Sequence, residues 1–294
     1  MGHSMHGNSV GELLTIAQRV IDRLDAQYML SHLLGMSRAS LIAHPDRVLG
    51  APEAATFRDW INQRANGRPV AQLLGVREFY GRMFGIDEHV LIPRPETEVL
   101  VEQALAAVSK QKWLDSPVKS GLSIFDLGTG SGAIAITLKL EVPDASVTAV
   151  EVSPAALRRA RANAMALNAA VTFMEGSWYS SLANQRAHLI VSNPPYVRRN
   201  DPHLAQGDLR FEPIVALTDQ SDDGLASIRT IVAGAGQHLL PDGWLLIEHG
   251  YDQAALVRDL MLSAGFVDVA STRDLSGIER VTAGRREDNA SKPL

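Results

Sequence analysis

A short motif, Asn193-Pro194-Pro195-Tyr196, places an amide side chain, two prolines and an aromatic ring directly after the apolar run 188–192. Neither proline has an N–H to give, so the strand predicted by that run must stop here, and Asn193 is held extended by the proline after it. In such a rigid corner, the Asn193 side-chain oxygen and the Pro194 carbonyl oxygen can accept both hydrogens of a planar NH2 group. The ring of Tyr196 can cover the flat face of that group. The candidate substrate-binding residues are therefore Asn193, Pro194, Pro195 and Tyr196, with catalytic roles for Asn193, Pro194 and Tyr196.

A second motif, Asp126-Leu127-Gly128-Thr129-Gly130-Ser131-Gly132, joins a strand-like run to a helical pattern. Its glycines allow a tight turn and a close approach to a ligand, and the free N–H groups of the helix start favour electronegative atoms. Glu151 ends the next predicted strand, 19 residues past Gly132 (151 − 132 = 19), where a carboxylate can accept hydrogen bonds from both hydroxyls of a ribose. Ligands bind at the carboxyl ends of the strands in such sheets. The predicted cofactor-binding residues are Gly128, Thr129, Gly130, Ser131, Gly132 and Glu151.

Two further residues are assigned to the cofactor site. Trp178 follows the third predicted strand, where its indole can stack on an adenine, although a core tryptophan would fit the same position. Asn193 is assigned to the cofactor as well as to the substrate. The nine histidines are scattered without metal-ligand spacing, so no metal site is predicted.

The glycine loop alone leaves a second cofactor class open. Gly128-x-Gly130-x-x-Ala133 also fits the dinucleotide fingerprint, which allows Ala at the last position and requires an acid about 20 residues further on. A nicotinamide-dependent oxidoreductase, or a cofactor-binding module without catalysis, is therefore an alternative from a different class. Asp126 directly before Leu-Gly and the corner at 193–196 argue against it, because hydride transfer has no evident use for an amide-holding corner.

The elements that must position these motifs follow two patterns. Residues 10–65 are helical in pattern, with one apolar stripe over 10–24 and another over 29–34 that Gly35 ends. Ser37 is expected to cap a short helix, and Pro52 to lie in the first turn of another. The segments 70–74 and 78–86, punctuated by glycines, are expected to form a β-hairpin connector.

From Leu122 onward, strand-like and helical runs alternate, which predicts a mainly parallel sheet with helices on both faces. A helix is also expected from the Pro93–Glu98 region to about Val108, then a polar loop over 110–121. The expected strands are 123–127, 147–152, 171–174, 188–192, 244–248, 266–271 and 280–283. The expected helices between them are 131–140, 154–167, 224–240 and 252–263.

Composition limits the alternatives. The 294 residues suit one large domain or two modest ones, and neither the 46% of hydrophobic residues nor the 21% of charged residues indicates a disordered chain. A net charge of -5 and a pI near 6.0 weaken the case for a nucleic-acid partner without excluding one. With no cysteine there can be no disulfide and no thiolate metal site, which fits a reducing compartment. No apolar run approaches the ~18 residues of a membrane span, and no signal peptide is recognised, so a cytoplasmic location without membrane contact is predicted.

Several motifs together closely resemble the HemK/PrmC family, whose bacterial-type members methylate N5 of a glutamine in peptide chain release factors. The Asn-Pro-Pro-Tyr motif alone is shared with DNA and RNA methyltransferases that act on exocyclic amino groups, which remain the alternative within the same class. The Ile-Pro-Arg-Pro-Glu-Thr-Glu and Arg-Phe-Glu-Pro segments make the resemblance more specific. It rests on residues 92–98, 126–132, 193–196, 201–204, 207–208, 210–213 and 248–250.

The resemblance implies an α/β fold, a class I, Rossmann-like methyltransferase domain with a seven-stranded, mainly parallel sheet. The implied division is a helical substrate-recognition domain (9–66), a β-hairpin connector (67–92), the methyltransferase domain (93–285) and a frayed tail (286–294). S-adenosyl-L-methionine is the implied cofactor and S-adenosyl-L-homocysteine its product. The implied substrate is the glutamine of the Gly-Gly-Gln motif in class 1 release factors, without stable nucleic-acid binding.

Two positions depart from the family pattern. Glu151 stands where relatives often have Asp, so the ribose contact would need a different backbone distance. Ser177 stands where relatives often carry an Asp near the adenine. The resemblance assigns Gly128–Gly132, Glu151 and Trp178 to the cofactor and Asn193–Tyr196 to the substrate glutamine.

Overall fold

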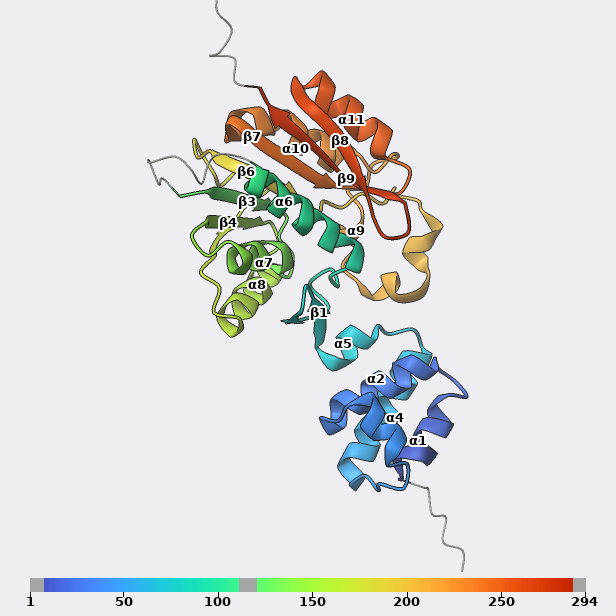
Figure 1. Cartoon of the computed structure of the whole chain (residues 1–294). Helices are drawn as coiled ribbons and strands as arrows, with labels where there is room; N and C mark the ends of the chain where they lie inside the picture. The colour runs from blue at the N-terminus through green and yellow to red at the C-terminus, as the bar shows by residue number, and fades with distance from the viewer. Residues whose placement is uncertain (1–7, 111–120, 288–294) are drawn as a thin grey trace, which may run out of the picture. The chain divides into compact units, whose positions relative to one another are not determined.

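The computed structural model describes residues 8–110 and 121–287 (Figure 1). The predicted loop residues 111–120 and the predicted tail residues 288–294 lie outside this range. The chain forms two compact units. One contains the residues up to Val76 together with Gln206–Phe211, and the other contains Arg77–Ala205 and the residues from Glu212 onward. A segment that follows the candidate catalytic corner in the chain therefore belongs to the N-terminal unit.

The N-terminal unit is a bundle of short helices around one apolar cluster. Its members include Leu13, Met29, Leu41 and Phe57, each no more than 1% exposed. Two predicted helix boundaries are confirmed: Gly35 adopts a left-handed φ of 60° at the end of its helix, and Ser37 accepts a hydrogen bond from Ser40 N as an N-cap. The helices are α1 (Val10–Ala17), α2 (Arg23–Leu34), α3 (Arg38–Ala43), α4 (Ala51–Ala65) and α5 (Val70–Leu74).

The expected single stripe over residues 10–24 is wrong beyond Ala17. Helix α1 ends there, and Val20 and Leu24 are 59% and 56% exposed. The reason is local: the Asp22 side chain accepts a hydrogen bond from Leu24 N at 2.6 Å and so caps a new helix, α2. A polar cap overrides the helical spacing of the apolar residues around it.

The expected β character of residues 70–74 is also wrong. These residues form helix α5, which begins after Pro69 and ends at Gly75 with a left-handed φ of 71°. The hairpin is confined to β1 (Val76–Phe79) and β2 (Arg82–Gly85). Tyr80 and Gly81 connect them with φ of 51° and 74°, the two positive values that a type I′ turn requires.

The second unit is built on a seven-stranded sheet with the order β5-β4-β3-β6-β7-β9-β8. All pairs from β5 to β7 are parallel, and β9 pairs antiparallel with both β7 and β8. This arrangement confirms the predicted seven-stranded, mainly parallel α/β fold. The strands are β3 (Ser123–Leu127), β4 (Ser146–Glu151), β5 (Thr172–Glu175), β6 (Ala187–Ser192), β7 (Leu239–Glu248), β8 (Phe266–Arg273) and β9 (Glu279–Arg286).

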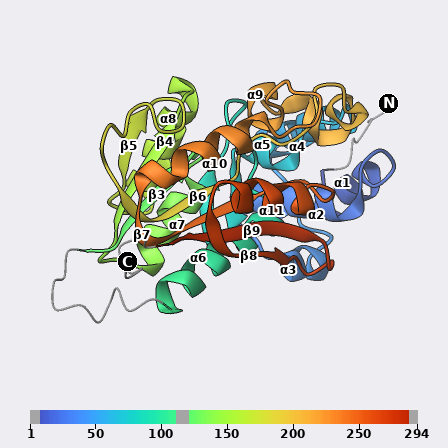
Figure 2. The ribbon, with the colours of Figure 1, turned by 90° about the horizontal axis from the view of Figure 1, so that it is seen from above.

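Helices cover both faces of the sheet (Figure 2). Helices α6 and α7 contact each other on one face, and α10 and α11 contact each other on the other. Short 3-10 turns lie in the connections of the described residues, among them η1 (Pro95–Thr97), η3 (Pro202–Ala205) and η4 (Gly207–Phe211). The helices are α6 (Glu98–Lys110), α7 (Ala133–Glu141), α8 (Pro154–Ala166), α9 (Ile214–Leu217), α10 (Ala226–His238) and α11 (Ala254–Ser263).

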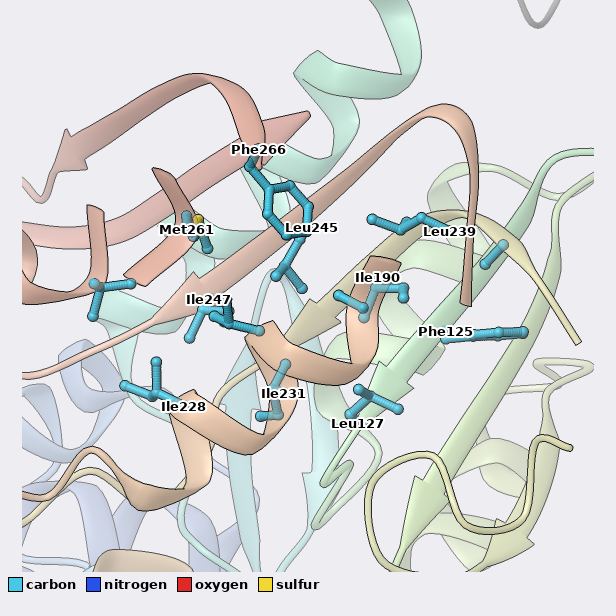
Figure 3. Packing of buried hydrophobic residues seen from close by; sticks show 14 of the residues in the cluster. Phe125, Leu127, Ile190, Ile228, Ile231, Leu239, Leu245, Ile247, Met261 and Phe266 are labelled. Atoms are coloured by element: carbon cyan, nitrogen blue, oxygen red, sulfur yellow. The ribbon is translucent and has the colours of Figure 1, made fainter. Parts of the chain in front are cut away.

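The main apolar core fills the space between the sheet and helices α10 and α11 (Figure 3). Leu127, Ile190 and Ile247 come from three neighbouring strands and pack with Ile228 and Ile231 of α10, all fully buried. Burying one such side chain stabilises the fold by about 1.5–3 kcal/mol. This packing fixes the strands in register, so the carboxyl ends of β3, β4, β6 and β7 lie along one edge of the sheet. Among the described residues no helix is both long and apolar enough to span a bilayer.

Candidate functional site

A pocket opens at the carboxyl ends of β3, β4 and β6. The segment His89–Thr97 and the start of α9 supply further walls through Leu91, Pro93, Val215 and Ala216. The sequence pattern did not assign these wall residues to the site. Of the predicted site residues, Gly128, Thr129, Gly130, Ser131, Glu151, Trp178, Asn193 and Pro195 line the pocket, and Gly132, Pro194 and Tyr196 are not in its lining.

The glycine loop takes its shape from left-handed backbone conformations. Gly128, Gly130 and Gly132 have φ of 74°, 55° and 84°, which residues with a Cβ rarely adopt. A Cβ on Gly128 would lie 3.3 Å from the Trp178 ring, whereas a Cβ on Gly130 would meet no atom within 4 Å. A Cβ on Gly132 would lie 2.8 Å from the Ile136 side chain, so Gly132 serves the packing of helix α7. Gly130 therefore leaves the loop backbone open, whereas Gly128 leaves room for the Trp178 ring.

Glu151 ties this loop to the neighbouring strand. Its Oε2 accepts a hydrogen bond from Gly130 N at 2.8 Å, and its Oε1 accepts one from Ser153 N at 2.9 Å. Although the residue is 8% exposed, it lines the pocket. A carboxylate offers about four lone-pair sites. The two backbone bonds therefore leave acceptor capacity directed at a ligand with hydroxyl groups.

Trp178 serves both the core and the pocket. Its ring packs against the main apolar cluster and lines the pocket beside Gly128. Its φ of 50° is unusual for a residue with a large side chain. Such strained conformations persist where the surrounding structure enforces them, often at binding sites. Trp178 therefore packs against the core and also forms part of the pocket wall.

Asp126 lies beneath the glycine loop and is fully buried. Its Oδ2 accepts hydrogen bonds from the Thr129 hydroxyl at 2.6 Å and from Ala135 N at 3.2 Å. Its Oδ1 has no partner among the described residues. Burial raises the pKa of Asp126 to about 7, and the nearby Glu151 carboxylate adds to that rise. Asp126 thus holds the loop in place and keeps one unpaired oxygen beneath it.

The corner at Asn193 is anchored on two sides. Ser192 Oγ donates a hydrogen bond to the Leu127 carbonyl oxygen at 2.7 Å, which joins the ends of β6 and β3. The Asn193 side-chain nitrogen donates to the Thr97 hydroxyl at 3.2 Å. With the amide in this orientation, the Asn193 side-chain oxygen is the atom available as an acceptor.

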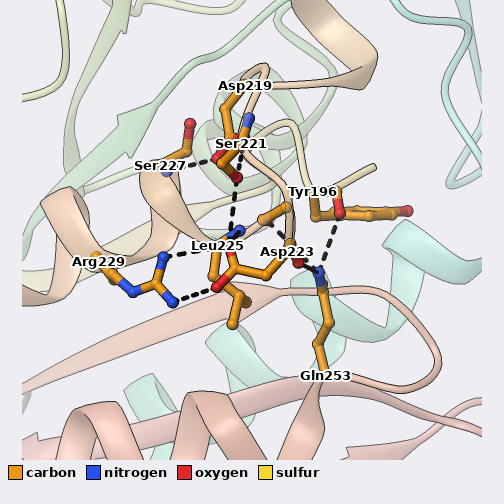
Figure 4. A network of polar contacts seen from close by, with 9 residues as sticks. Tyr196, Asp219, Ser221, Asp223, Leu225, Ser227, Arg229 and Gln253 are labelled. Atoms are coloured by element: carbon orange, nitrogen blue, oxygen red, sulfur yellow. Dashed lines mark hydrogen bonds and ion pairs between the residues drawn. The ribbon is translucent and has the colours of Figure 1, made fainter. Parts of the chain in front are cut away.

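The backbone of Tyr196 is held in place by the side chain of Gln253 (Figure 4). The buried Gln253 donates through Nε2 to the carbonyl oxygens of Tyr196 and Asp223, at 3.0 Å and 3.1 Å. Its Oε1 accepts from Gly250 N at 2.8 Å, which fixes the orientation of the amide. The ring of Tyr196 packs against the main apolar cluster, and its hydroxyl donates to Glu248 at 3.4 Å. This clamp determines where the motif turns.

A buried ion pair, between Glu212 and Arg94, holds in place the segment that forms one wall of the pocket. The fully buried Glu212 side chain accepts from Ile92 N at 2.9 Å and pairs with Arg94. Pro93, between these two partners, lines the pocket. Breaking such a buried pair by removing one partner typically costs about 3–5 kcal/mol. Glu212 therefore orders a wall of the pocket, although it lies 120 residues after Ile92 in the sequence.

No cluster of three or more His, Cys, Asp or Glu side chains suited to a metal ion occurs in residues 8–110 and 121–287.

Known protein families and individual relatives match most of the length of this chain. Residues 12–75 match the PrmC N-terminal domain, and residues 111–208 match the Methyltransferase small domain. A release factor glutamine methyltransferase from Burkholderia pseudomallei is 52% identical over 272 residues, covering 90% of this chain and 92% of the relative. Another with the same name, from Bordetella pertussis, is 48% identical over 270 residues, covering 92% of this chain and 97% of the relative.

Among solved structures, a methyltransferase from Pyrococcus furiosus matches with a TM-score of 0.50 and 14% sequence identity. The match covers 78% of this chain and 99% of that one, and at this identity it supports the fold alone. The two curated relatives each match nearly end to end at about half identity. The chain therefore belongs to the release factor glutamine methyltransferase family.

Proposed function

We propose that this chain transfers a methyl group from S-adenosyl-L-methionine to the N5 amide nitrogen of a release factor glutamine. The proposal extends to the glutamine of the Gly-Gly-Gln motif in class 1 release factors. The observation that carries it is the orientation of Asn193, whose side-chain nitrogen is bonded to Thr97 and whose oxygen remains for a substrate NH2. Asn193 lines the same pocket as the glycine loop and Glu151.

The residues of the pocket fit S-adenosyl-L-methionine. Glu151 has acceptor capacity left for ribose hydroxyls, and the Trp178 indole offers an apolar face for an adenine. The open backbone at Gly130 permits close approach of a ligand. The bound cofactor supplies an electrophilic methyl group on a sulfonium centre. No residue is assigned to a metal, and the proposed transfer requires none.

Asn193 and Pro194 are proposed to activate and aim the substrate amide. An amide nitrogen is a poor nucleophile because its lone pair is delocalised into the carbonyl group. Hydrogen bonds from its NH2 group to the Asn193 side-chain oxygen and the Pro194 carbonyl oxygen return electron density to nitrogen. They also hold it in one orientation, which lowers the entropic part of the barrier. Acceptors placed where positive charge develops stabilise the transition state further.

The proton on nitrogen needs no dedicated base in this scheme. Once nitrogen carries the methyl group and a positive charge, its proton is acidic and can leave to solvent. Tyr196 is proposed to fix the corner through its backbone, because Gln253 bonds its carbonyl oxygen and the partly buried ring packs against the main apolar cluster. This part of the proposal changes its role from covering the substrate to positioning Pro194 and Asn193.

The helical unit is proposed to recognise the release factor. The corner at Asn193 accepts any planar amide, so it cannot choose among the glutamines of a cell, and selection must come from remote surface. A cytoplasmic location is part of the proposal, because translation terminates there. Stable binding to nucleic acid or membrane is not expected.

The test is a competition for labelled methyl groups. The protein is incubated with S-adenosyl-L-methionine labelled on its methyl carbon, together with purified class 1 release factor, ribosomal RNA and DNA in separate reactions. We expect label on the release factor only, and almost none with the Asn193→Ala variant. Label on RNA or DNA, with none on release factor, would support a nucleic-acid amino-methyltransferase instead.

A further inference from the structure

His249 is a buried imidazole that the proposed transfer does not use. It directly follows the last residue of β7 and is fully buried. Its Nδ1 lies 3.0 Å from the Gly250 carbonyl oxygen, and its Nε2 lies 2.8 Å from the Thr282 hydroxyl oxygen. Both ring nitrogens are therefore bonded inside the protein, and His249 is not among the residues that line the pocket.

The Gly250 carbonyl group determines which ring nitrogen carries the proton. A carbonyl oxygen can only accept, so His249 Nδ1 must donate to it, and in the neutral ring Nε2 is then an acceptor. The Thr282 hydroxyl donates to Nε2, and its oxygen accepts from the Ser271 hydroxyl at 2.8 Å. Arg258, which can only donate, bonds the Ser271 oxygen at 2.7 Å. Each donor in this row finds an acceptor when His249 is the neutral Nδ1–H tautomer.

The surroundings keep this ring neutral. Burial lowers the pKa of His249 below its usual value, and the Arg258 and Arg280 charges act in the same direction. The bond to the Gly250 carbonyl oxygen and the Glu279 charge oppose this shift without outweighing it. Above neutral pH the ring therefore carries a single proton, the one that Nδ1 donates.

Gly250 connects His249 to the residue that holds the candidate catalytic motif. The Gly250 carbonyl oxygen accepts from Gln253 N at 3.1 Å as well as from the His249 ring, and Gly250 N donates to Gln253 Oε1 at 2.8 Å. A Cβ on Gly250 would lie 3.0 Å from Gln253 Oε1, so these two residues are in close contact. Gln253 in turn donates to the Tyr196 carbonyl oxygen (Figure 4). A continuous set of hydrogen bonds thus joins His249 to the motif that contains Asn193.

We propose that His249, as the neutral Nδ1–H tautomer, is a positioning residue for the Asn193 corner. It does not touch the substrate in this scheme. It fixes the Gly250 peptide, which orients Gln253, and Gln253 holds the Tyr196 carbonyl oxygen. This inference rests on the proposed function for its effect on turnover, but the proton on the ring and the bond at Gly250 can be measured without any reaction.

Two substitutions separate the two bonds of the ring. In His249→Asn the side-chain nitrogen can take the place of Nδ1 and donate to Gly250, but no atom reaches Thr282. In His249→Gln the longer side chain can reach Thr282 with its amide group, but no donor remains in the place of Nδ1. Glutamine is nearer to histidine in volume, so a role in packing alone would make His249→Gln the milder change. The proposal predicts the reverse.

His238→Gln is the matched control. His238 is also buried, and its Nδ1 lies 3.0 Å from another backbone carbonyl oxygen, that of Gln185. Its ring stacks on Tyr179, and neither of these two residues lines the pocket. We expect His238→Gln to lower Tm without lowering kcat on release factor.

Turnover on release factor at pH 8 tests the positioning role. We expect His249→Gln to lower kcat about tenfold, with the affinity for S-adenosyl-L-homocysteine unchanged. His249→Asn should retain most of the activity, because it keeps the donor to Gly250. A loss in His249→Asn or in His238→Gln as large as that in His249→Gln would overturn the proposal, and so would full activity of His249→Gln.

Two further readouts do not depend on the reaction. In 15N-labelled unaltered protein at pH 8, the imidazole spectrum of His249 should show a proton on Nδ1 and none on Nε2. Hydrogen exchange at the Gly250 amide is compared with exchange at Leu246, in the middle of β7, so that a change in global stability is separated from a local one. The Gly250 amide should exchange about tenfold faster in His249→Gln and at a nearly unchanged rate in His249→Asn.

These readouts separate the inference from the proposed function. A proton on His249 Nε2, or the same Gly250 exchange rate in His249→Gln as in the unaltered protein, would disprove the inference even if release factor is methylated. The expected spectrum and exchange rates without methylation of release factor would leave the positioning of Gly250 standing and refute the proposed function.

Discussion

Gly130 N donates a hydrogen bond to Glu151 Oε2 at 2.8 Å and so joins the loop after β3 to the end of β4. The same loop is tied to β4 a second time, because Gly128 N and Thr129 N both donate to the Val150 carbonyl oxygen, at 2.9 Å and 3.0 Å. The carboxylate therefore has two tasks: it shapes the loop and offers acceptors to the pocket. Removing it should disturb both.

Glu151→Ala should weaken the binding of S-adenosyl-L-homocysteine by roughly 1.5–3 kcal/mol, because hydrogen bonds to a charged acceptor are lost. That range corresponds to roughly a ten- to hundredfold rise in Kd, measurable by titration calorimetry. Glu175→Ala is the control, since Glu175 pairs with Glu151 in register at the end of β5 but is exposed and outside the pocket lining. Equal affinities for the two variants would contradict the assignment.

Gly224→Ala should displace the Asn193 corner. Gly224 has a left-handed φ of 69°, and a Cβ there would lie 2.2 Å from the Tyr196 carbonyl oxygen, which Gln253 holds in place. The backbone strain alone costs about 1–3 kcal/mol, and relief of the clash requires Tyr196 to move. We expect a lower Tm and a kcat reduced more than the affinity for S-adenosyl-L-homocysteine.

Gly236→Ala provides the comparison within α10. Gly236 is exposed, its φ is not positive, and a Cβ there would meet nothing within 4 Å. Replacing a helical glycine with alanine stabilises by about 0.5–1 kcal/mol. Its Tm should rise or stay constant, and its turnover should not change. If Gly224→Ala and Gly236→Ala had the same Tm and the same turnover, the close approach of Gly224 to Tyr196 would not matter for activity.

The sequence was sufficient to predict the sheet and its motifs but not the walls around them. The strand ends at Leu127, Glu151 and Ser192 could be predicted because short apolar runs stop there, near a glycine, an acidic residue or a proline. In the structure these three strand ends lie at the same edge of the sheet. Those patterns are local, so they can be recognised without knowing the fold. The wall at Pro93 depends on Glu212, which binds Ile92 across 120 residues, and no local pattern encodes such a contact.

The two local errors have local causes as well. At Asp22 a side-chain cap begins a new helix, although the spacing of apolar residues in the sequence continues past it. Residues 70–74, between Pro69 and Gly75, are too few for hydrophobic periodicity to distinguish a helix from a strand. The membership of Gln206–Phe211 in the N-terminal unit was not foreseen either. It depends on Arg64 binding Asp208 at 2.7 Å and on Gln72 binding the Phe211 carbonyl oxygen at 2.8 Å, contacts between distant parts of the chain.

Stability should depend on pH through Glu248. Its pKa in the folded protein is raised from 4.5 to about 7, so the folded state holds this proton more tightly than the unfolded state between those values. Stability from this group is then greatest below about pH 4.5 and is lost as pH rises through 7, by roughly 3 kcal/mol in total. Urea unfolding at several pH values between 5 and 8 should show the unaltered protein losing stability relative to Glu248→Gln as pH rises.

The difference between the two proteins is the informative quantity, because other groups titrate too. Burial lowers the pKa of His249, which destabilises the fold as pH falls, and burial raises the pKa of Asp126 in both proteins. These contributions cancel in the comparison. A constant difference in unfolding free energy across this range would mean that Glu248 titrates normally and is not held in a dry site.

Removal of the residues before Arg68 should impair selection of the substrate protein. We expect the shortened protein to bind S-adenosyl-L-homocysteine, since the residues that line the pocket all come from 89–216. It should methylate intact release factor much more slowly, while a short Gly-Gly-Gln peptide, poor for both proteins, should be affected far less. The measured quantity is the ratio of the two rates, protein over peptide. A ratio that does not change in a folded shortened protein would show that the helical unit does not select the substrate.

The central claim is that this site methylates one amide nitrogen, and locating the methyl group tests it most directly. Purified class 1 release factor is treated with the protein and S-adenosyl-L-methionine, digested, and analysed by tandem mass spectrometry beside a sample treated with Asn193→Ala. The account predicts a gain of one methyl group on the glutamine side chain of the Gly-Gly-Gln peptide with the unaltered protein. It predicts little or none with Asn193→Ala, although that variant still binds S-adenosyl-L-homocysteine. A methyl group on any other residue, or equal methylation by both proteins, would contradict it.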